Sequence, residues 1–172
     1  MSLEEALSLK EIPSEIKNTL QLVDVEYFSF GGVIEKGQIV VRKDLANEVK
    51  FIFSKLLEWK FPIEKIIPVN KYDWSDDKSM EDNNSSAFNY RVIYGTDRLS
   101  KHSYGTAIDI NPVQNPYFPA DGTVHPKNGK YEPAAPGTIT VNSDVVNLFE
   151  SLGWQWGGRW ENKDWQHFEK KL

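Results

Sequence analysis

The segment at residues 45–59 has the clearest periodicity in this sequence and constrains the fold more than any other segment. Its apolar residues recur at the spacing of an amphipathic helix, at Leu45, Val49, Ile52, Leu56 and Trp59. Asp44 stands just before this segment, where it is suited to cap the helix. Strand-like segments flank it at residues 22–30, 38–42 and 66–69. We therefore expect the apolar face of the helix to be buried against a sheet.

The middle of the chain combines a polar segment with strand-like ones. Residues 72–86 are acidic and polar, and we expect a solvated loop there. Residues 87–93 and 106–110 alternate in the manner of strands, and residues 94–105 between them are polar and contain glycine. We expect two strands joined by a loop.

The last third of the chain begins with a long loop and ends in regular elements. Residues 111–137 contain six prolines and three glycines with little periodicity, and loops of such length often serve as lids or binding loops. Ser143 or Asn142 is then placed to cap a helix that ends at Gly153 and carries Val145, Val146, Phe149 and Leu152. An aromatic strand pair completes the sequence.

The order of these elements predicts the fold class. A short helical pattern at residues 7–20, interrupted by Pro13, precedes the first strand. The elements lack the regular alternation of a doubly wound sheet, so we expect an α+β fold with an antiparallel central sheet and helices packed on one side. With 172 residues the chain has the length of one domain.

Composition excludes several classes of protein. The net charge of -5 is spread along the chain without a Lys/Arg cluster, so we expect no nucleic-acid partner. There is no cysteine, so any metal must be held by histidines and carboxylates. No apolar run approaches the roughly 20 residues of a membrane-spanning helix.

The histidines point to a metal site. Two of the three lie in dense polar and aromatic contexts, His102 and His167, whereas His125 lies in the proline-rich loop. Two imidazoles and one carboxylate leave a fourth metal position open for water, as hydrolysis requires, and Asp109 completes such a set. Taken alone, a histidine and an aspartate seven positions apart are more often a loop imidazole and a strand carboxylate bonded to backbone groups.

Two motifs reach beyond this single pair. The pattern Ser-x-His-x-x-Gly-x-Ala-x-Asp resembles the metal signature of zinc D-alanyl-D-alanine carboxypeptidases and dipeptidases of the vancomycin-resistance type, and of L-alanyl-D-glutamate endolysins. Its positions are filled here by Ser100, His102, Gly105, Ala107 and Asp109. Residues 164–168, Asp-Trp-Gln-His-Phe, resemble the acidic-x-x-His-Phe segment of the same family. The two motifs occur in the family's order.

The resemblance implies a metal centre and a general base. One zinc ion would be held by His102, Asp109 and His167, and Asp164 would be the base. Many relatives have glutamate at that position, which is one methylene longer, although the endolysin branch also uses aspartate. Because residues three apart point to opposite faces of a strand, Asp164 must stand at a bend that enters the strand of His167.

The resemblance also suggests residues that contact the substrate. Arg91 matches the family arginine that faces the substrate carbonyl or carboxylate, and Arg98, nearer the motif, is the second candidate. Ser100 is a candidate substrate-contacting hydroxyl, with a serine bonded to its own backbone as the alternative.

The likeness extends over most of the chain. Residues 76–91 and 109–112 resemble the carboxypeptidase-like branch, so a family-like core spans residues 37–168 and leaves residues 1–36 as an N-terminal extension. The loop at residues 111–137 matches no motif. The resemblance implies a hedgehog/DD-peptidase-like fold.

The implied function is a zinc peptidase of the carboxypeptidase type that acts on peptidoglycan stem peptides, at either the D-Ala-D-Ala or the L-Ala-D-Glu bond. Such a substrate places the enzyme in the cell envelope or periplasm, with any native leader absent from this sequence. A non-catalytic zinc-binding module, like the hedgehog signalling domain, is the main alternative, and the presence of Asp164 and Arg91 favours an enzyme. A non-haem iron oxygenase is disfavoured, because its first histidine and acid are usually two positions apart and not seven. A purely structural metal site is also disfavoured, because it would lack the open metal position.

Overall fold

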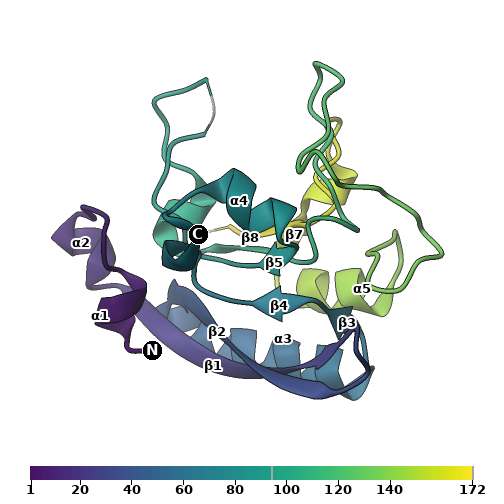
Figure 1. Ribbon diagram of the computed structural model, residues 1–172, viewed down its shortest axis with the longest axis horizontal. Coiled ribbons are helices and arrows are strands. Elements are labelled where there is room, and N and C mark those ends of the chain that lie inside the picture. The colour runs from purple at the N-terminus through teal and green to yellow at the C-terminus, as the bar shows by residue number, and fades with distance from the viewer. Residues whose placement is uncertain (94, 172) are drawn as a thin grey trace.

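Figure 1 shows the computed structural model of the protein, which describes residues 1–93 and 95–171. Helices and strands both contribute, so the α+β class is confirmed. The helices are α1 (Leu3–Ala6), α2 (Ser14–Lys17), α3 (Ala46–Glu58), α4 (Asp76–Glu81) and α5 (Asp144–Ser151). The strands are β1 (Leu20–Ser29), β2 (Ile34–Arg42), β3 (Pro62–Ile63), β4 (Lys65–Ile66), β5 (Asn84–Ser85), β6 (Ala107–Asp109), β7 (Trp154–Trp156) and β8 (His167–Lys170). Short 3-10 helices are η1 (Lys43–Leu45), η2 (Val69–Tyr72), η3 (Lys101–Tyr104) and η4 (Gly157–Arg159).

The hairpin of β1 and β2 forms the base of the fold. The two strands pair antiparallel from Leu20 opposite Arg42 to Phe28 opposite Ile34. Along β1 buried and exposed side chains alternate over much of the strand, as expected for a strand with one face on the core. The apolar stripe of α3 packs against this face and buries Val49, Ile52, Phe53 and Leu56. The predicted contact of this helix with a sheet is confirmed.

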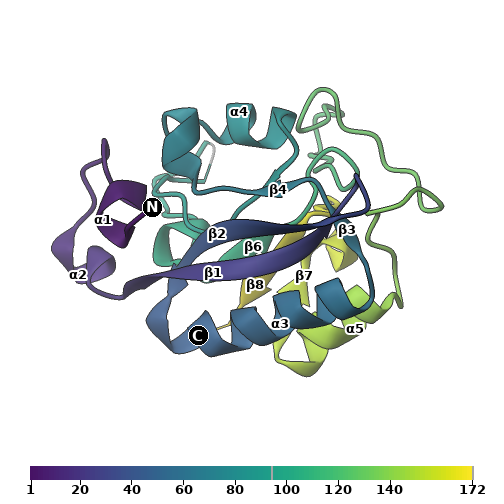
Figure 2. The ribbon, with the colours of Figure 1, turned by 60° about the horizontal axis from the view of Figure 1, so that its bottom comes forward.

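The sheet arrangement matches the prediction in part. Antiparallel pairing joins β1 to β2 and both β6 and β7 to β8, and α3 and α5 lie on one side of the strands (Figure 2). The described strands nevertheless form three short sheets, and β1–β3 and β4–β5 are parallel. The β4–β5 ladder ends before Ile67. The backbone N–H and carbonyl of Ile67 bond to the side-chain amide of Asn84, which takes the place of a strand partner. The short helix α4 lies on the opposite side of the strands from α3.

Two predictions for the middle of the chain were wrong. Residues 72–86 are not a simple loop, because α4 begins after Ser75, whose side chain accepts a hydrogen bond from the backbone of Lys78. Residues 87–93 do not form the predicted strand. The backbone N–H groups of Phe88 and Asn89 bond to separate segments, at Val40 and His102 respectively, instead of to one neighbouring strand.

The helix boundaries correct one cap and support another. Asp44 does not cap α3, because it lies within η1 and its carboxylate binds the guanidinium of Arg42. The early helical pattern is reduced to α2, which begins directly after Pro13. Ser143 caps α5 as predicted, with its side chain accepting a hydrogen bond from the backbone of Val146. In the described part of the chain, no helix has the length and apolar character needed to cross a bilayer.

The second half of the core orients the strand that carries His167. Phe168 is fully buried and its ring stacks on Phe149 of α5, with the ring centroids 3.9 Å apart. Because neighbouring residues of a strand point to opposite faces, His167 and Glu169 point away from this aromatic layer. The packing of Phe168 therefore determines which face of β8 is available for a functional site.

Candidate metal centre

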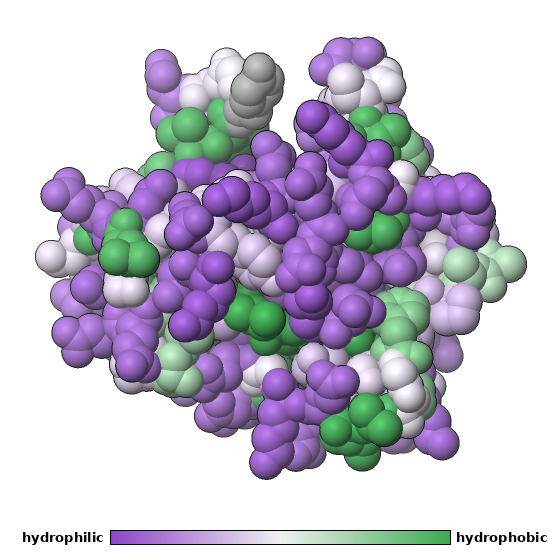
Figure 3. All heavy atoms as spheres, in the orientation of Figure 1, coloured by the Kyte–Doolittle hydropathy of each residue, from purple (hydrophilic) through white to green (hydrophobic). Residues whose placement is uncertain are grey.

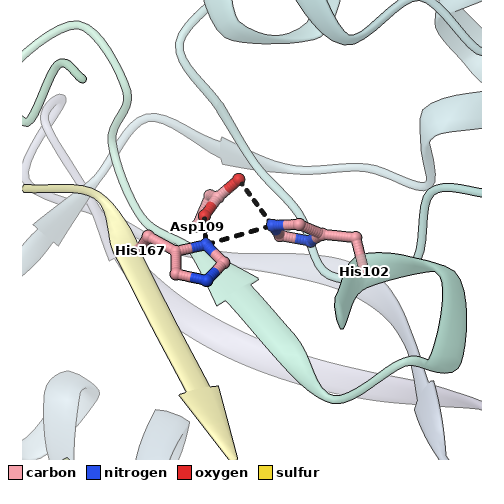
Figure 4. A group of neighbouring side chains, drawn as sticks. All are labelled: His102, Asp109 and His167. Carbon is pink, nitrogen blue, oxygen red and sulfur yellow. Dashed lines mark hydrogen bonds and ion pairs between the residues drawn. The ribbon is translucent and has the colours of Figure 1, made fainter. Parts of the chain in front are cut away.

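Three separate elements bring His102, Asp109 and His167 together (Figure 4). His102 lies in η3, Asp109 is the last residue of β6, and His167 is the first residue of β8. The register of β6 and β8 places Asp109 directly opposite His167. All three residues are buried, with exposed fractions of 3%, 6% and 7%. A carboxylate between two imidazoles is thus held in a site from which most water is excluded.

The potential ligand atoms of these residues converge. Asp109 Oδ2 lies 3.1 Å from His102 Nε2, and Asp109 Oδ1 lies 2.9 Å from His167 Nδ1. The two imidazole nitrogens are 3.2 Å apart. These atoms all lie within 4.8 Å of one another, so the group can hold a metal ion. A donor set of two imidazole nitrogens and one carboxylate oxygen suits Zn²⁺.

The other nitrogen of each imidazole donates a hydrogen bond to a protein acceptor. His102 Nδ1 donates to the backbone carbonyl of Ala87 at 2.5 Å, and His167 Nε2 donates to Glu169 Oε2 at 3.2 Å. In a neutral imidazole with one nitrogen protonated, the lone pair is on the remaining nitrogen. The hydrogen bonds therefore direct His102 Nε2 and His167 Nδ1 toward the shared centre, as metal binding requires.

The electrostatics of the group reflect this close packing. Burial acts to raise the pKa of Asp109, but the charges and hydrogen bonds of His102 and His167 outweigh it and hold that pKa well below its ordinary value. Burial acts to lower the pKa of His167, but its hydrogen bonds to Asp109 and Glu169 raise that pKa to about 10. The site thus favours a positive charge next to the carboxylate, which a cation can supply.

The backbone conformation and close surroundings of Gly105 explain why the first motif has glycine at this position. It ends η3 with a φ of +65°, in the left-handed region, and its carbonyl accepts a hydrogen bond from Arg42 N at 2.9 Å. A Cβ atom at this position would lie 2.7 Å from Arg42 N and 2.9 Å from the carbonyl carbon of Val41. The turn that delivers His102 therefore approaches β2 too closely for any other residue.

We expect Gly105→Ala to destabilise the protein by at least about 2 kcal/mol, because left-handed strain adds to a backbone clash. Thermal or urea unfolding of the metal-free protein measures this loss. Gly122→Ala is the matched control, since Gly122 also has a positive φ, +79°, but nothing lies within 4 Å of its added Cβ. Equal losses in the two variants would show that φ alone accounts for the effect and that the contact with β2 does not matter.

Asp164 lies beside the three-residue group. It stands just before the turn at residues 165–166 that leads into β8, at the bend that strand geometry requires. Its backbone pairs with Tyr117 in the long loop, and Gly157 packs against it so closely that a Cβ there would lie 2.8 Å from Asp164 Cβ. Burial raises the pKa of Asp164 to about 7, against the opposing charge of His167.

Arg91 forms an ion pair with Asp76 and is close enough to Asp164 to influence it electrostatically. Arg91 Nη2 lies 2.8 Å from Asp76 Oδ2 at the start of α4, and Asn89 Nδ2 donates to Asp76 Oδ1 at 3.1 Å. Within residues 1–93 and 95–171, Asp164 Oδ1 and Arg91 Nε are buried atoms without a hydrogen-bond partner. The charge of Arg91 acts on the pKa of Asp164. Asp164 thus has an unused hydrogen-bond acceptor, and Arg91, whose charge acts on Asp164, has an unused donor.

Residues 94–170 match a family model described as D-alanyl-D-alanine carboxypeptidase. Over this segment, which is less than half of the chain, the sequence is similar to that peptidase family. The match confirms the resemblance seen in the two sequence motifs. No curated protein and no solved structure matches the chain.

The matched peptidase segment contains the whole metal centre and Asp164, whereas Arg91 lies just before it. The structure also shows where the other candidates lie. Ser100 is buried and its side chain accepts a hydrogen bond from the backbone of His102, so it supports the turn of η3. Arg98 is exposed on the loop that follows Arg91. His125 lies in the long loop and its Nε2 is 3.0 Å from Thr123 Oγ1, outside the group that could hold a metal.

Two neighbours of His167 were not selected from the sequence. Glu169 was not among the candidate residues, although it stands two residues after His167 and therefore on the same face of the strand. The two-residue separation of His167 and Glu169 in the sequence was enough to predict this shared face. The ring of Trp160 lies over His167 with the centroids 5.3 Å apart and remains partly exposed. No periodicity in the sequence indicates this contact, because Trp160 lies outside any strand or helix.

Proposed function

We propose that this protein is a zinc-dependent peptidase that hydrolyses D-amino-acid-containing bonds in peptidoglycan stem peptides. The observation that carries the proposal is the convergence of His102, Asp109 and His167 within a segment of the D-alanyl-D-alanine carboxypeptidase family. The family description favours the terminal D-Ala-D-Ala bond, with the L-Ala-D-Glu bond as the second possibility. Such a substrate would place the protein in the cell envelope, outside the cytoplasm.

The donor set supports zinc and a hydrolytic role. Three protein ligands, two nitrogens and one oxygen, leave a coordination position for water or substrate. When bound, zinc supplies a Lewis acid that polarises a carbonyl and lowers the pKa of water to about 7. The chain itself supplies the proton transfers and the contacts with the substrate.

Asp164 is proposed as the group that moves the proton. Its Oδ1 is buried and has no partner among the described residues, so it is free to accept a proton from the attacking water. The same oxygen then returns this proton to the departing amine. A carboxylate whose pKa is raised to about 7 is suited to both steps at neutral pH.

Arg91 is proposed to bind the carbonyl or carboxylate of the substrate. Its ion pair with Asp76 orients the guanidinium and leaves the buried Nε without a partner among the described residues. Figure 3 shows two projections on this side of the molecule with a notch between them. They correspond to the loop that follows Arg91 and the loop at residues 111–137 (Figure 1). Arg91 directly precedes the first of these loops in the sequence, and Tyr117, whose backbone pairs with that of Asp164, belongs to the second. We propose that the peptide enters this notch.

The experiment that tests the function uses purified peptidoglycan fragments, the zinc-loaded protein and mass spectrometry, with and without a chelator. Chelator-sensitive loss of one terminal alanine would support the carboxypeptidase. Release of the stem peptide from L-Ala would instead assign the protein as an endopeptidase. Zinc binding without cleavage of any stem peptide would contradict the proposed function and favour a non-catalytic zinc-binding module.

Arg91→Ala should lower kcat/KM by roughly 100-fold, since loss of one donor to developing negative charge costs about 3 kcal/mol in other enzymes. Steady-state kinetics on the cleaved stem peptide measures the effect, and zinc content should stay at the wild-type level. Arg98→Ala is the control, because that arginine is exposed on the loop. If Arg98→Ala were the slower variant, the substrate contact would have to be reassigned to Arg98.

A further inference from the structure

We infer that Glu169 is a positioning residue that holds the imidazole of His167 in the orientation needed to bind the metal. This inference deepens the proposed function and rests on the metal centre, not on the identity of the cleaved bond. The geometry that carries it is the 3.2 Å contact between Glu169 Oε2 and His167 Nε2 on one face of β8.

The strands of the third sheet place Glu169 for this contact. Glu169 stands two residues after His167, so both side chains lie on the same face of β8. The residue opposite Glu169 in β6 is Ala107, as Asp109 is opposite His167, and the residue opposite Glu169 in β7 is Gln155. The small side chain of Ala107 leaves space over this position, so the carboxylate can turn toward the imidazole.

Glu169 acts on the ring from the side away from the metal centre. The two nitrogens of an imidazole point in divergent directions, and His167 Nδ1 faces Asp109 while Nε2 faces Glu169. The carboxylate is therefore placed to orient the ligand, and not to touch the reacting atoms. An ionised acceptor on the distal N–H also makes the imidazole a stronger electron donor to a metal.

The two histidines differ in this support. His102 donates its distal N–H to a neutral carbonyl, that of Ala87, whereas His167 donates to a carboxylate. The side chain of Glu169 is mostly buried, and His167 is its one ion-pair partner among the residues that the structure describes. An ordinary surface carboxylate would instead be exposed or paired with lysine or arginine. The interaction of the Glu169 carboxylate in this structure is therefore with the His167 imidazole.

The test measures zinc affinity of the full-length protein by chelator competition. Glu169→Ala and Glu169→Met both remove the acceptor, the second with little change in length, and we expect each to raise the Kd for zinc roughly 10- to 100-fold. Glu169→Gln keeps an acceptor oxygen and should recover most of the affinity. In the Co²⁺-loaded protein, the visible absorption bands should shift for the alanine and methionine variants and less for glutamine.

Glu48→Ala is the matched control. Glu48 is also a partly buried carboxylate, bonded to Lys170 Nζ at 2.6 Å and to Trp154 Nε1 at 2.6 Å. Its loss should lower the unfolding temperature without changing the Kd for zinc or the Co²⁺ spectrum. If Glu169→Ala does not fold, Glu169→Met gives the same measurement.

Wild-type zinc affinity in a folded Glu169→Ala or Glu169→Met variant would overturn the inference. So would an equal loss of affinity in Glu48→Ala, because the effect would then be a general loss of structure. The proposed peptidase fails separately, if the wild-type protein binds zinc and cleaves no stem peptide. A wild-type protein that binds no zinc would contradict the metal centre on which both depend.

Discussion

Asp109→Ala will lose zinc binding and, with it, peptidase activity. The carboxylate of Asp109 lies within 3.1 Å of a nitrogen of each histidine, so its removal takes away one of three ligands and the group that pairs the other two. Apparent zinc affinities of roughly 10–16 kcal/mol in four-ligand sites correspond to about 2.5–4 kcal/mol per ligand. We therefore expect the Kd for zinc to rise by at least about 100-fold.

Isothermal titration or chelator competition measures this change, and Asp82→Ala is the control. Asp82 is a partly exposed carboxylate that also has two side-chain partners, Tyr72 and Lys65, but it takes no part in the metal group. Its removal should leave the Kd for zinc unchanged. Retention of zinc by Asp109→Ala at wild-type affinity would show that the metal, if bound, lies elsewhere.

Asp164→Ala should retain zinc and lose catalysis. A positioned general base contributes roughly 10²- to 10⁴-fold to the rate, so kcat should fall by that factor. The Kd for zinc should remain within about twofold of the wild-type value, because Asp164 lies outside the three-residue group. Fixed-time activity assays on stem peptides, together with measurement of the zinc content of the same samples, separate loss of catalysis from loss of zinc.

Asp164→Asn serves as the companion variant. Asparagine has nearly the same size and would keep the packing against Gly157, but it cannot accept a proton. If the role of Asp164 were only to fill this space, Asp164→Asn would be as active as the wild type. Full turnover in either zinc-loaded variant would eliminate Asp164 as the base.

Local patterns were sufficient for several elements of the fold. The apolar spacing at residues 45–59 predicted α3, and Ser143 followed by an apolar pattern predicted the start of α5. Both signals are local, since a helix is formed by residues close in sequence. The same locality explains two failures. Asp44 has the right chemistry for a cap, but its carboxylate binds Arg42 instead. Helix α4 begins directly after Ser75, within a segment whose acidity suggested a loop.

Strand predictions were weaker because a strand is defined by its partners. Residues 87–93 alternate like a strand, yet their N–H groups bond to β2 at one residue and to η3 at the next. Neither partner can be read from the segment itself. In the opposite sense, the two residues of β5 carry no alternation and still pair with β4.

The sequence alone selected the residues of the candidate metal centre, because the spacing of His102 and Asp109 and the distant His167 match a family motif. The two-residue spacing also places Glu169 on the strand face of His167, but only the structure showed the contact between the two side chains. Only the tertiary structure decided how these side chains are positioned, which partners they have and how their pKa values are shifted. The register of β6 and β8 sets Asp109 opposite His167, α4 supplies the Asp76 partner of Arg91, and burial raises the pKa of Asp164. These properties depend on contacts between segments far apart in the chain, and on the removal of water, which no local pattern records.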